Sequence, residues 1–168
     1  MSATASRETP ATAIDIRPFT PADAPAFFTL NEAWIAPLFG MEDRDQVTLG
    51  NPQQTILDPG GEILMAFLGD RPVACCALIP EPGHDGVYEL AKMSVAGDLR
   101  GHGIGRRLLL AAVALARTLG AHRLTLGSST RLPNAVHLYE SIGFRHIPEE
   151  QRPPILLART DVFMEMDL

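Results

Sequence analysis

The chain has 168 residues, of which 46% are hydrophobic and 20% are charged, and its formal net charge is −6. A chain of this length forms one domain that buries about two-thirds of its unfolded surface. A negative net charge disfavours nucleic acid as the main partner. No apolar run of about eighteen residues occurs in the sequence, so we expect no membrane-spanning helix and no membrane partner.

Residues 1–12 are small and polar, and they include Arg7 and Glu8 but no apolar segment. This composition predicts a flexible N-terminus without a secretory signal, and therefore a cytoplasmic protein. We expect the folded domain to occupy residues 13–168.

The first part of this domain is predicted to form a strand and a helix, followed by an interrupted region. Residues 14–18 alternate between apolar and polar side chains, as in a half-buried strand. Thr20 is a suitable N-cap for a helix over residues 21–34, which has a proline at its first position. Glycine and proline interrupt residues 37–61, where we expect a short helix over 42–49, then a loop and a hairpin.

Three strands are predicted next. Residues 63–68 and 73–80 flank a Gly-Asp-Arg-Pro turn and are expected to form an antiparallel pair. Residues 87–95 form a long, largely apolar segment. We expect this segment to be the central strand of the sheet.

The two cysteines, Cys75 and Cys76, are adjacent within an apolar run. This placement is typical of buried strand residues and not of a disulfide framework, with a reactive thiol as the alternative. The five histidines lie at positions 84, 102, 122, 137 and 146, without the paired spacing of a zinc site. We therefore expect no metal.

A glycine-rich turn leads from the central strand into a long helix. Residues 100–105 read Arg-Gly-His-Gly-Ile-Gly, and a helix is predicted over residues 104–119, with Gly120 suited to the position after its end. Glycines let main-chain N–H groups approach a ligand closely, and the first-turn amides of a helix have no internal partners. Such a turn suits a phosphate or pyrophosphate, with a plain tight turn as the alternative. Its spacing matches neither a nucleotide P-loop nor the dinucleotide-binding G-x-G-x-x-G motif.

The rest of the chain is predicted to complete the sheet. Alternation of side chains and flanking proline and glycine residues indicate the boundaries of each element. The predicted elements are a strand over 122–128, a helix over 134–142 opened by Pro133, a strand over 144–147, a loop over 148–154 and a last strand over 160–168.

Two motifs resemble those of the GNAT superfamily of N-acetyltransferases. Arg100-x-x-Gly103-x-Gly105 is similar to the acyl-CoA signature of that family, and the predicted helix that ends in Gly143-Phe144 resembles its second landmark. The resemblance extends from about residue 14 to residue 166. It implies an α/β (α+β) fold, in which a single domain has a mixed central sheet of about six to seven strands flanked by helices, with a splayed central strand.

The resemblance also implies acetyl-CoA as the acyl donor. Main-chain groups of the central strand are expected to bind the pantetheine arm at a bulge, with plain core packing as the alternative for Met93 and Val95. The glycine turn is expected to bind the pyrophosphate. Asn134 matches an asparagine that bonds to the cofactor arm, with capping of its own helix as the alternative. The residues assigned to the cofactor are Met93, Ser94, Val95, Arg100, Gly101, His102, Gly103, Ile104, Gly105, Arg106 and Asn134.

Two residues are expected to be catalytic. Glu89 matches a general-base glutamate of the family, with an ion pair to Lys92 or Arg123 as one alternative and an anchor for a cationic acceptor as another. Tyr139 lies where the family often has a tyrosine that donates a proton to the departing thiolate, with packing alone as the alternative. His137 is expected on another face of the same helix, in contact with solvent.

We therefore expect an N-acetyltransferase that moves an acetyl group from acetyl-CoA to a primary amine by direct attack, without a covalent enzyme intermediate. The alternative is a non-catalytic acyl-CoA-binding sensor or regulatory module of the same fold. Residues 34–61 and 148–159 are expected to shape the acceptor site, and a homodimer is retained as an alternative to a monomer. A cationic acceptor is favoured by the acidic residues Glu42, Asp43, Asp45 and Glu89.

Overall fold

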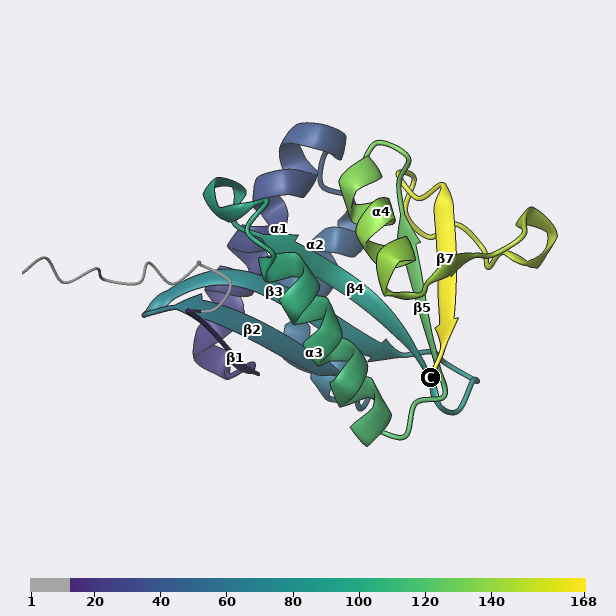
Figure 1. Ribbon diagram of the computed structural model, residues 1–168, viewed down its shortest axis with the longest axis horizontal. Coiled ribbons are helices and arrows are strands. Elements are labelled where there is room, and N and C mark those ends of the chain that lie inside the picture. Colours follow the sequence, from purple (N-terminus) through teal and green to yellow (C-terminus); the bar gives the residue numbers. More distant parts are fainter. Residues whose placement is uncertain (1–12) are drawn as a thin grey trace, which may run out of the picture.

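The computed structural model describes residues 13–168 as a seven-stranded mixed sheet with helices on both faces (Figure 1). The predicted α/β fold is thereby confirmed, whereas the flexible segment predicted for residues 1–12 lies outside the described residues. The strands are β1 (Ile14–Pro18), β2 (Glu62–Leu68), β3 (Arg71–Pro80), β4 (Val87–Val95), β5 (Arg123–Ser128), β6 (Arg145–His146) and β7 (Val162–Asp167). The α-helices are α1 (Ala24–Phe39), α2 (Asp43–Gly50), α3 (Ile104–Thr118) and α4 (Pro133–Ile142).

The strands follow the order β1-β2-β3-β4-β5-β7-β6. All neighbouring pairs are antiparallel except β4 and β5, which are parallel. The connection between these parallel strands contains α3, as expected for a strand-helix-strand crossover. Within residues 13–168, none of the helices has the length and apolar character needed to span a bilayer.

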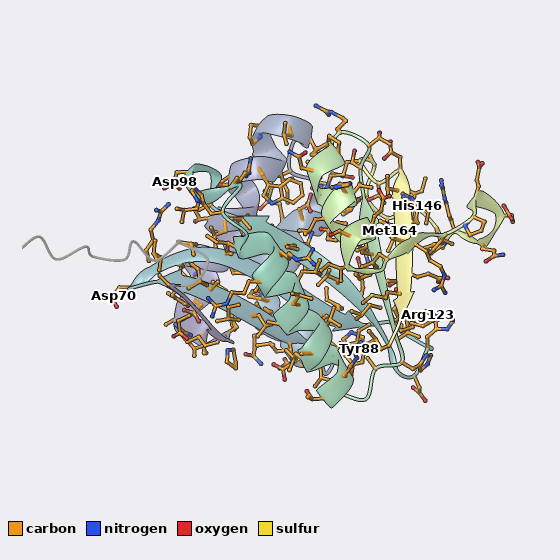
Figure 2. The ribbon with its side chains drawn as sticks, viewed as in Figure 1. Asp70, Tyr88, Asp98, Arg123, His146 and Met164 are labelled. Atoms are coloured by element: carbon orange, nitrogen blue, oxygen red, sulfur yellow. The ribbon has the colours of Figure 1, made fainter. Side chains whose placement is uncertain are left out.

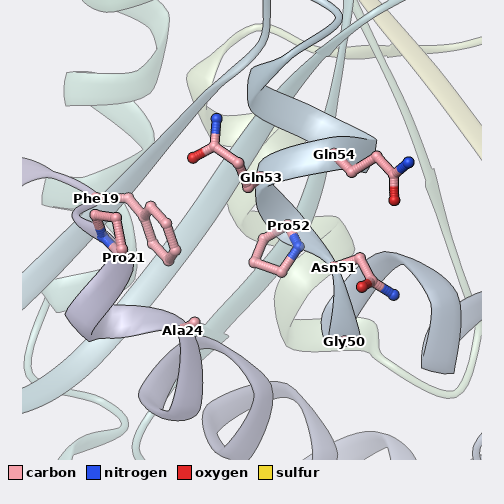
Figure 3. Close-up of a pocket in the computed structure, with 8 residues that line it drawn as sticks. All are labelled: Phe19, Pro21, Ala24, Gly50, Asn51, Pro52, Gln53 and Gln54. Atoms are coloured by element: carbon pink, nitrogen blue, oxygen red, sulfur yellow. The ribbon is translucent and has the colours of Figure 1, made fainter.

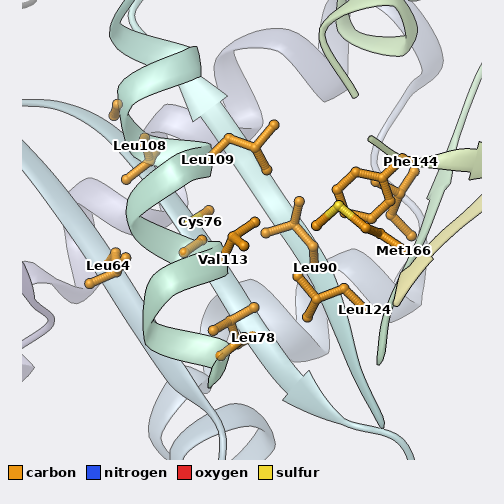
Figure 4. Close-up of a cluster of buried hydrophobic side chains, with 14 of the residues drawn as sticks. Leu64, Cys76, Leu78, Leu90, Leu108, Leu109, Val113, Leu124, Phe144 and Met166 are labelled. Atoms are coloured by element: carbon orange, nitrogen blue, oxygen red, sulfur yellow. The ribbon is translucent and has the colours of Figure 1, made fainter. Parts of the chain in front are cut away.

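The two faces of the sheet have separate cores. The helix α3 packs its buried side, which includes Leu108 and Leu109, against residues of β2, β3, β4 and β5 (Figure 4). The helices α1 and α2 cover the opposite face and lie behind the sheet in Figure 1, where Phe27 and Ile35 pack on Met65. Burial of these apolar side chains on both faces is the main force that holds the layers together.

Helix α1 is longer than the sequence pattern predicts. It begins after a 3-10 turn over Pro21–Asp23 and continues past Trp34 to Phe39, with Pro37 in its last turn. The helix ends at Gly40, whose φ of 78° is readily adopted by glycine and whose N–H bonds to two carbonyls of the last turn. The glycine, and not the proline, therefore ends this helix.

The interrupted region also differs in one respect from the prediction. The short helix is present as α2, but a π-helical turn over Gln53–Leu57 stands where a loop was predicted, and β2 and β3 form the hairpin that follows. Ile56 in this turn is fully buried against the α1 side of the sheet. Burial of this side chain explains why the segment coils onto the core instead of extending.

The central strand β4 separates from β5 and then has a bulge. Its register against β3 changes between Ala91 and Ser94, and Lys92 within this interval has a φ of 52°. Because of the extra residue, Leu90 and Met93 face the same core although they are three residues apart. Pairing with β5 involves only residues 87–89 of β4, so the splayed central strand implied by the resemblance is present.

Candidate active site

The separation of β4 from β5 exposes one edge of β4 close to the glycine-rich turn. Among the described strands, no partner bonds to this edge of β4 after Glu89. A Cβ atom at Gly105 would lie 3.5 Å from Met93 Cε and 3.6 Å from Val95 Cγ2. The start of α3 therefore lies against the part of β4 that has unpaired main-chain groups, at a distance where a Cβ atom would make ordinary van der Waals contact.

Two glycines of the glycine-rich turn have a left-handed backbone conformation. Gly101 and Gly103 have φ values of 80° and 79°, which glycine adopts without a steric penalty. Gly103 is the N-cap of α3, and residues 100–103 are exposed to solvent. A Cβ at Gly101 would meet no atom within 4 Å, so there is open space beside the turn. The N–H groups at the start of α3 are thus accessible to a phosphate.

The side chains of the other residues assigned to the cofactor have different surroundings. Arg106 donates a hydrogen bond to Ser141 Oγ on α4 at 3.1 Å. The Ser94 hydroxyl donates to the Leu30 carbonyl at 2.6 Å, so this residue can offer a ligand its main chain alone. Asn134 is exposed in the first turn of α4. Leu132 is the N-cap of that helix, so the alternative that Asn134 caps it is wrong.

Tyr139 projects from α4 toward the bulged part of β4. Its hydroxyl donates to Met93 Sδ at 3.9 Å, and its ring lies edge-on to Phe144 at 5.9 Å between centroids. Burial, with a smaller effect from Cys76, raises the pKa of Tyr139 to about 12. The phenol therefore stays protonated at neutral pH and can act as a donor, and packing and proton donation are compatible at this position.

Glu89 is half-buried at the last residue where β4 pairs with β5. The ion pairs considered for it are wrong, because Lys92 bonds to Asp45 and Arg123 bonds to Asp167 in the described part of the chain. Arg123 lies near the C-terminal end of the chain (Figure 2). It is distant from Asp98, which precedes the glycine-rich turn.

The pKa of the Glu89 carboxyl is raised, firstly by burial and secondly by the negative charge of Glu81. Positive charges on Lys92 and Arg44 oppose this rise. Glu81 lies near Glu89 because both are close to Thr125. The Thr125 hydroxyl donates a hydrogen bond to Glu81 Oε1, and Thr125 on β5 pairs with Glu89 on β4. A carboxyl with a raised pKa is a better proton acceptor than an ordinary glutamate.

An ionic cluster on the α2 side was missed by the sequence analysis. We define the Asp45 cluster as Asp45, Lys92 and Arg159. Lys92 Nζ lies 2.9 Å from Asp45 Oδ1, and both terminal nitrogens of Arg159 lie 2.7 Å from the same carboxylate. Burial alone would raise the pKa of Asp45, but bonds from Arg159 and Lys92 hold it well below its usual range. Each residue looks like an ordinary surface charge in the sequence, so no local signal predicts their meeting.

Both cysteines are buried in β3, as predicted. Burial raises the pKa of the Cys76 thiol to about 12, and it raises that of Cys75 as well, with a smaller effect from Cys76. A thiol is nucleophilic as its thiolate, so neither cysteine is suited to nucleophilic catalysis. No group of three or more metal-binding side chains occurs among residues 13–168.

A surface pocket lies between the start of α1 and the π-helical turn (Figure 3). Its lining is apolar or carries uncharged amides, so it offers neither a base nor an acid. The residues that line it are Phe19, Pro21, Ala24, Gly50, Asn51, Pro52, Gln53 and Gln54. None of them belongs to the candidate active site.

The model of the acetyltransferase (GNAT) family matches residues 25–144, which is more than half of the chain. The chain belongs to this family. A curated relative, the mycothiol acetyltransferase of Pseudarthrobacter chlorophenolicus, is 29% identical over 137 residues. The match covers 78% of this chain but only 42% of that relative, so the chain spans about two-fifths of its length.

Solved structures of the family share the fold of this GNAT chain. The crystal structure of a GNAT-family acetyltransferase from Staphylococcus aureus Mu50 has a TM-score of 0.81 and 22% identity, with 92% of this chain and 98% of that chain covered. YncA from Salmonella typhimurium, solved with its cofactor acetyl-CoA, has a TM-score of 0.68 and 20% identity, with 92% and 93% covered.

Proposed function

We propose that this GNAT domain transfers an acetyl group from acetyl-CoA to a primary amine. The observation that carries the proposal is the convergence of three features at one edge of β4: the exposed glycine-rich turn, the unpaired main chain of the bulge and the Tyr139 hydroxyl. The turn suits the pyrophosphate of the donor, the unpaired main chain suits its pantetheine arm, and the hydroxyl suits its thioester sulfur.

The donor fits the groups that the chain offers. In our proposal, the main chain of Met93, Ser94 and Val95 bonds to the pantetheine arm as a neighbouring strand would. The turn of residues 100–106 binds the pyrophosphate with its N–H groups and nearby positive charge, and Asn134 bonds to the arm from α4. The open space beside Gly101 supports this assignment.

The reaction we propose is direct attack by the neutral amine on the thioester carbonyl. The new C–N bond forms as the C–S bond breaks, the amine loses a proton and the thiolate gains one. Glu89 accepts the proton from the amine, directly or through a water molecule, and Tyr139 donates its proton to the sulfur. A free amine with a pKa near 10.4 is mostly protonated at neutral pH, so a base is needed.

A non-catalytic acyl-CoA sensor is the second candidate, and it needs only the turn and the bulge. Release of free thiol during incubation with acetyl-CoA and a panel of primary amines separates the two functions. Acceptor-dependent release with a 1:1 yield of acetylated amine supports the enzyme, and tight CoA binding without release by any amine supports the sensor. The cytoplasmic location, the homodimer and the domain limits at residues 13 and 168 stay predictions.

Donor binding is tested with Gly103→Glu and a matched control, Gly120→Glu. The two glycines have φ values of 79° and 82°, one as the N-cap of α3 and the other just after its C-cap, so both variants add the same charge at a glycine with a positive φ. We expect CoA to raise the Tm of the unsubstituted protein by mass action. Gly103→Glu should lose this rise because its carboxylate repels the pyrophosphate, and Gly120→Glu should keep it. Equal CoA affinity in a folded Gly103→Glu variant would refute the assignment of the turn.

A further inference from the structure

The Asp45 cluster joins three segments that are distant in the sequence. The Asp45 side chain has no exposed surface, and the side chains of Lys92 and Arg159 are 10% and 9% exposed. The three residues come from α2, from the bulge of β4 and from the segment that precedes β7. Such a cluster fixes these segments relative to one another, because separating any pair would leave a buried charge without a partner.

Lys92 carries strain at the position where β4 bulges. With a φ of 52°, it is the one residue other than glycine with a positive φ among residues 13–168. A side chain in this conformation is disfavoured, and it persists where surrounding interactions hold it. The ion pair from Lys92 Nζ to Asp45 is one such interaction. A second is the contact of Cys75 Sγ with the Lys92 carbonyl at 3.6 Å.

Arg159 completes the cluster from the opposite side. Its guanidinium lies 5.9 Å from the ring centroids of both Trp34 and Phe39, and it also pairs with Glu42 at 3.5 Å. These contacts hold Asp45 in place independently of Lys92. The Asp45 carboxylate therefore has a defined position, and the Lys92 ammonium group forms its ion pair with it there.

We propose that Asp45 and Lys92 are positioning residues for the acyl donor: their ion pair holds the left-handed bulge and thereby directs the main chain of residues 93–95 toward the pantetheine arm. This inference rests on the proposed function of the site. Both side chains act through the conformation of β4 and not by contact with the reacting atoms.

The test compares CoA binding by Lys92→Ala, Lys92→Gly and Lys92→Arg, measured by isothermal titration calorimetry on the full chain. Alanine and glycine both remove the ion pair, but glycine adopts a positive φ freely. We expect Lys92→Ala to weaken CoA binding at least about fivefold and to raise KM for acetyl-CoA more than it lowers kcat. Lys92→Gly should recover most of this loss, and Lys92→Arg should bind as the unsubstituted protein does, because it keeps the charge.

The outcomes separate this inference from the proposed function. Unchanged CoA affinity in Lys92→Ala, or equal losses in the alanine and glycine variants, overturns the role of the bulge while donor binding stands. Absence of CoA binding by the unsubstituted protein overturns both proposals. If Lys92→Ala does not fold, Lys92→Gly decides: affinity within about twofold of the unsubstituted protein supports the inference, and any larger loss overturns it.

Discussion

The face of the sheet that α3 covers buries an apolar cluster, whereas the face that α1 and α2 cover also buries Asn31, Asp45 and Ser94. On the α3 face, leucine and alanine side chains of the helix pack on the strands. On the other face, hydrogen bonds and ion pairs accompany the apolar contacts.

The two faces stabilise the candidate active site by different kinds of interaction. Apolar packing on the α3 face is non-directional, and it leaves the turn before α3 free to meet a ligand. Ion pairs on the α1–α2 face are directional, and removal of one partner is costly because the others remain buried. Tyr139 packs against the apolar cluster on the α3 face, and Glu89 lies in β4 at the end of its pairing with β5.

The largest expected effect on stability comes from a substitution in the Asp45 cluster, on the face that α1 and α2 cover. Asp45→Asn should lower the free energy of unfolding by about 3–5 kcal/mol, because Lys92 and Arg159 lose their buried counter-charge. Asp98→Asn is the control, since its pair with Arg71 is similarly short at 2.6 Å but exposed to solvent, and its loss should be much smaller than that of Asp45→Asn because water screens the pair. Urea denaturation measures both variants, and equal losses would contradict the comparison of buried and exposed pairs.

The same carboxyl also predicts a dependence of stability on pH. The folded-state pKa of Asp45 lies below its ordinary value of 3.8, with burial opposing and the bonds from Arg159 and Lys92 causing this decrease. Its contribution to stability is therefore complete above about pH 4 to 5 and is lost as the pH falls toward the folded-state pKa. Asp45→Asn should show a smaller loss of stability than the unsubstituted protein over this acidic range.

The next largest expected effect is on kcat/KM and comes from substitution of Glu89, the proposed general base. Glu89→Gln should lower kcat/KM by roughly 10- to 1,000-fold near neutral pH while CoA affinity is kept, because the amine loses its proton acceptor. The loss should shrink at alkaline pH, where free amine is already present. In the unsubstituted protein the acidic limb of kcat/KM should lie above the ordinary glutamate pKa of 4.5, because burial and Glu81 raise the pKa of Glu89. A pH-independent loss that appears wholly in KM would show an acceptor anchor instead.

Tyr139→Phe tests the proposed proton donor on α4. It should lower kcat by roughly 10- to 1,000-fold, because it removes the hydroxyl but keeps the ring that packs on Phe144. Tyr88→Phe is the matched control, since Tyr88 is the other tyrosine of the chain and packs on the same core. The measurement is kcat under conditions where C–S cleavage limits the rate. An unchanged kcat in Tyr139→Phe would show that Tyr139 has a structural role and does not donate the proton.

The smallest expected effect sharpens the assignment of Glu89. Glu81→Gln keeps an oxygen that can accept the Thr125 hydrogen bond but removes the negative charge that raises the pKa of Glu89. The acidic limb of kcat/KM should therefore move to lower pH, by less than about one unit. Glu150→Gln, which changes an exposed residue of the loop before β7, should leave the limb in place. Movement in the opposite direction would remove Glu81 from the environment of Glu89.

The sequence by itself determined the features that depend on local preference. Strand alternation, the glycines of residues 100–105 and the helix that follows them are encoded by neighbouring residues, and each appears where it was predicted. Burial of Cys75 and Cys76 followed from their apolar run for the same reason. The resemblance placed Tyr139 on the helix that ends at Gly143, and α4 has that end.

Only the tertiary structure decided the features that depend on distant residues. Asp45 meets Lys92 across 47 positions and Arg159 across 114, and no local pattern reports such a meeting. The positive φ of Lys92 depends on the register between β3 and β4, and the π-helical turn depends on the core that buries Ile56. Charged side chains are exposed by default, so whether one becomes a buried partner is settled when separate segments pack together.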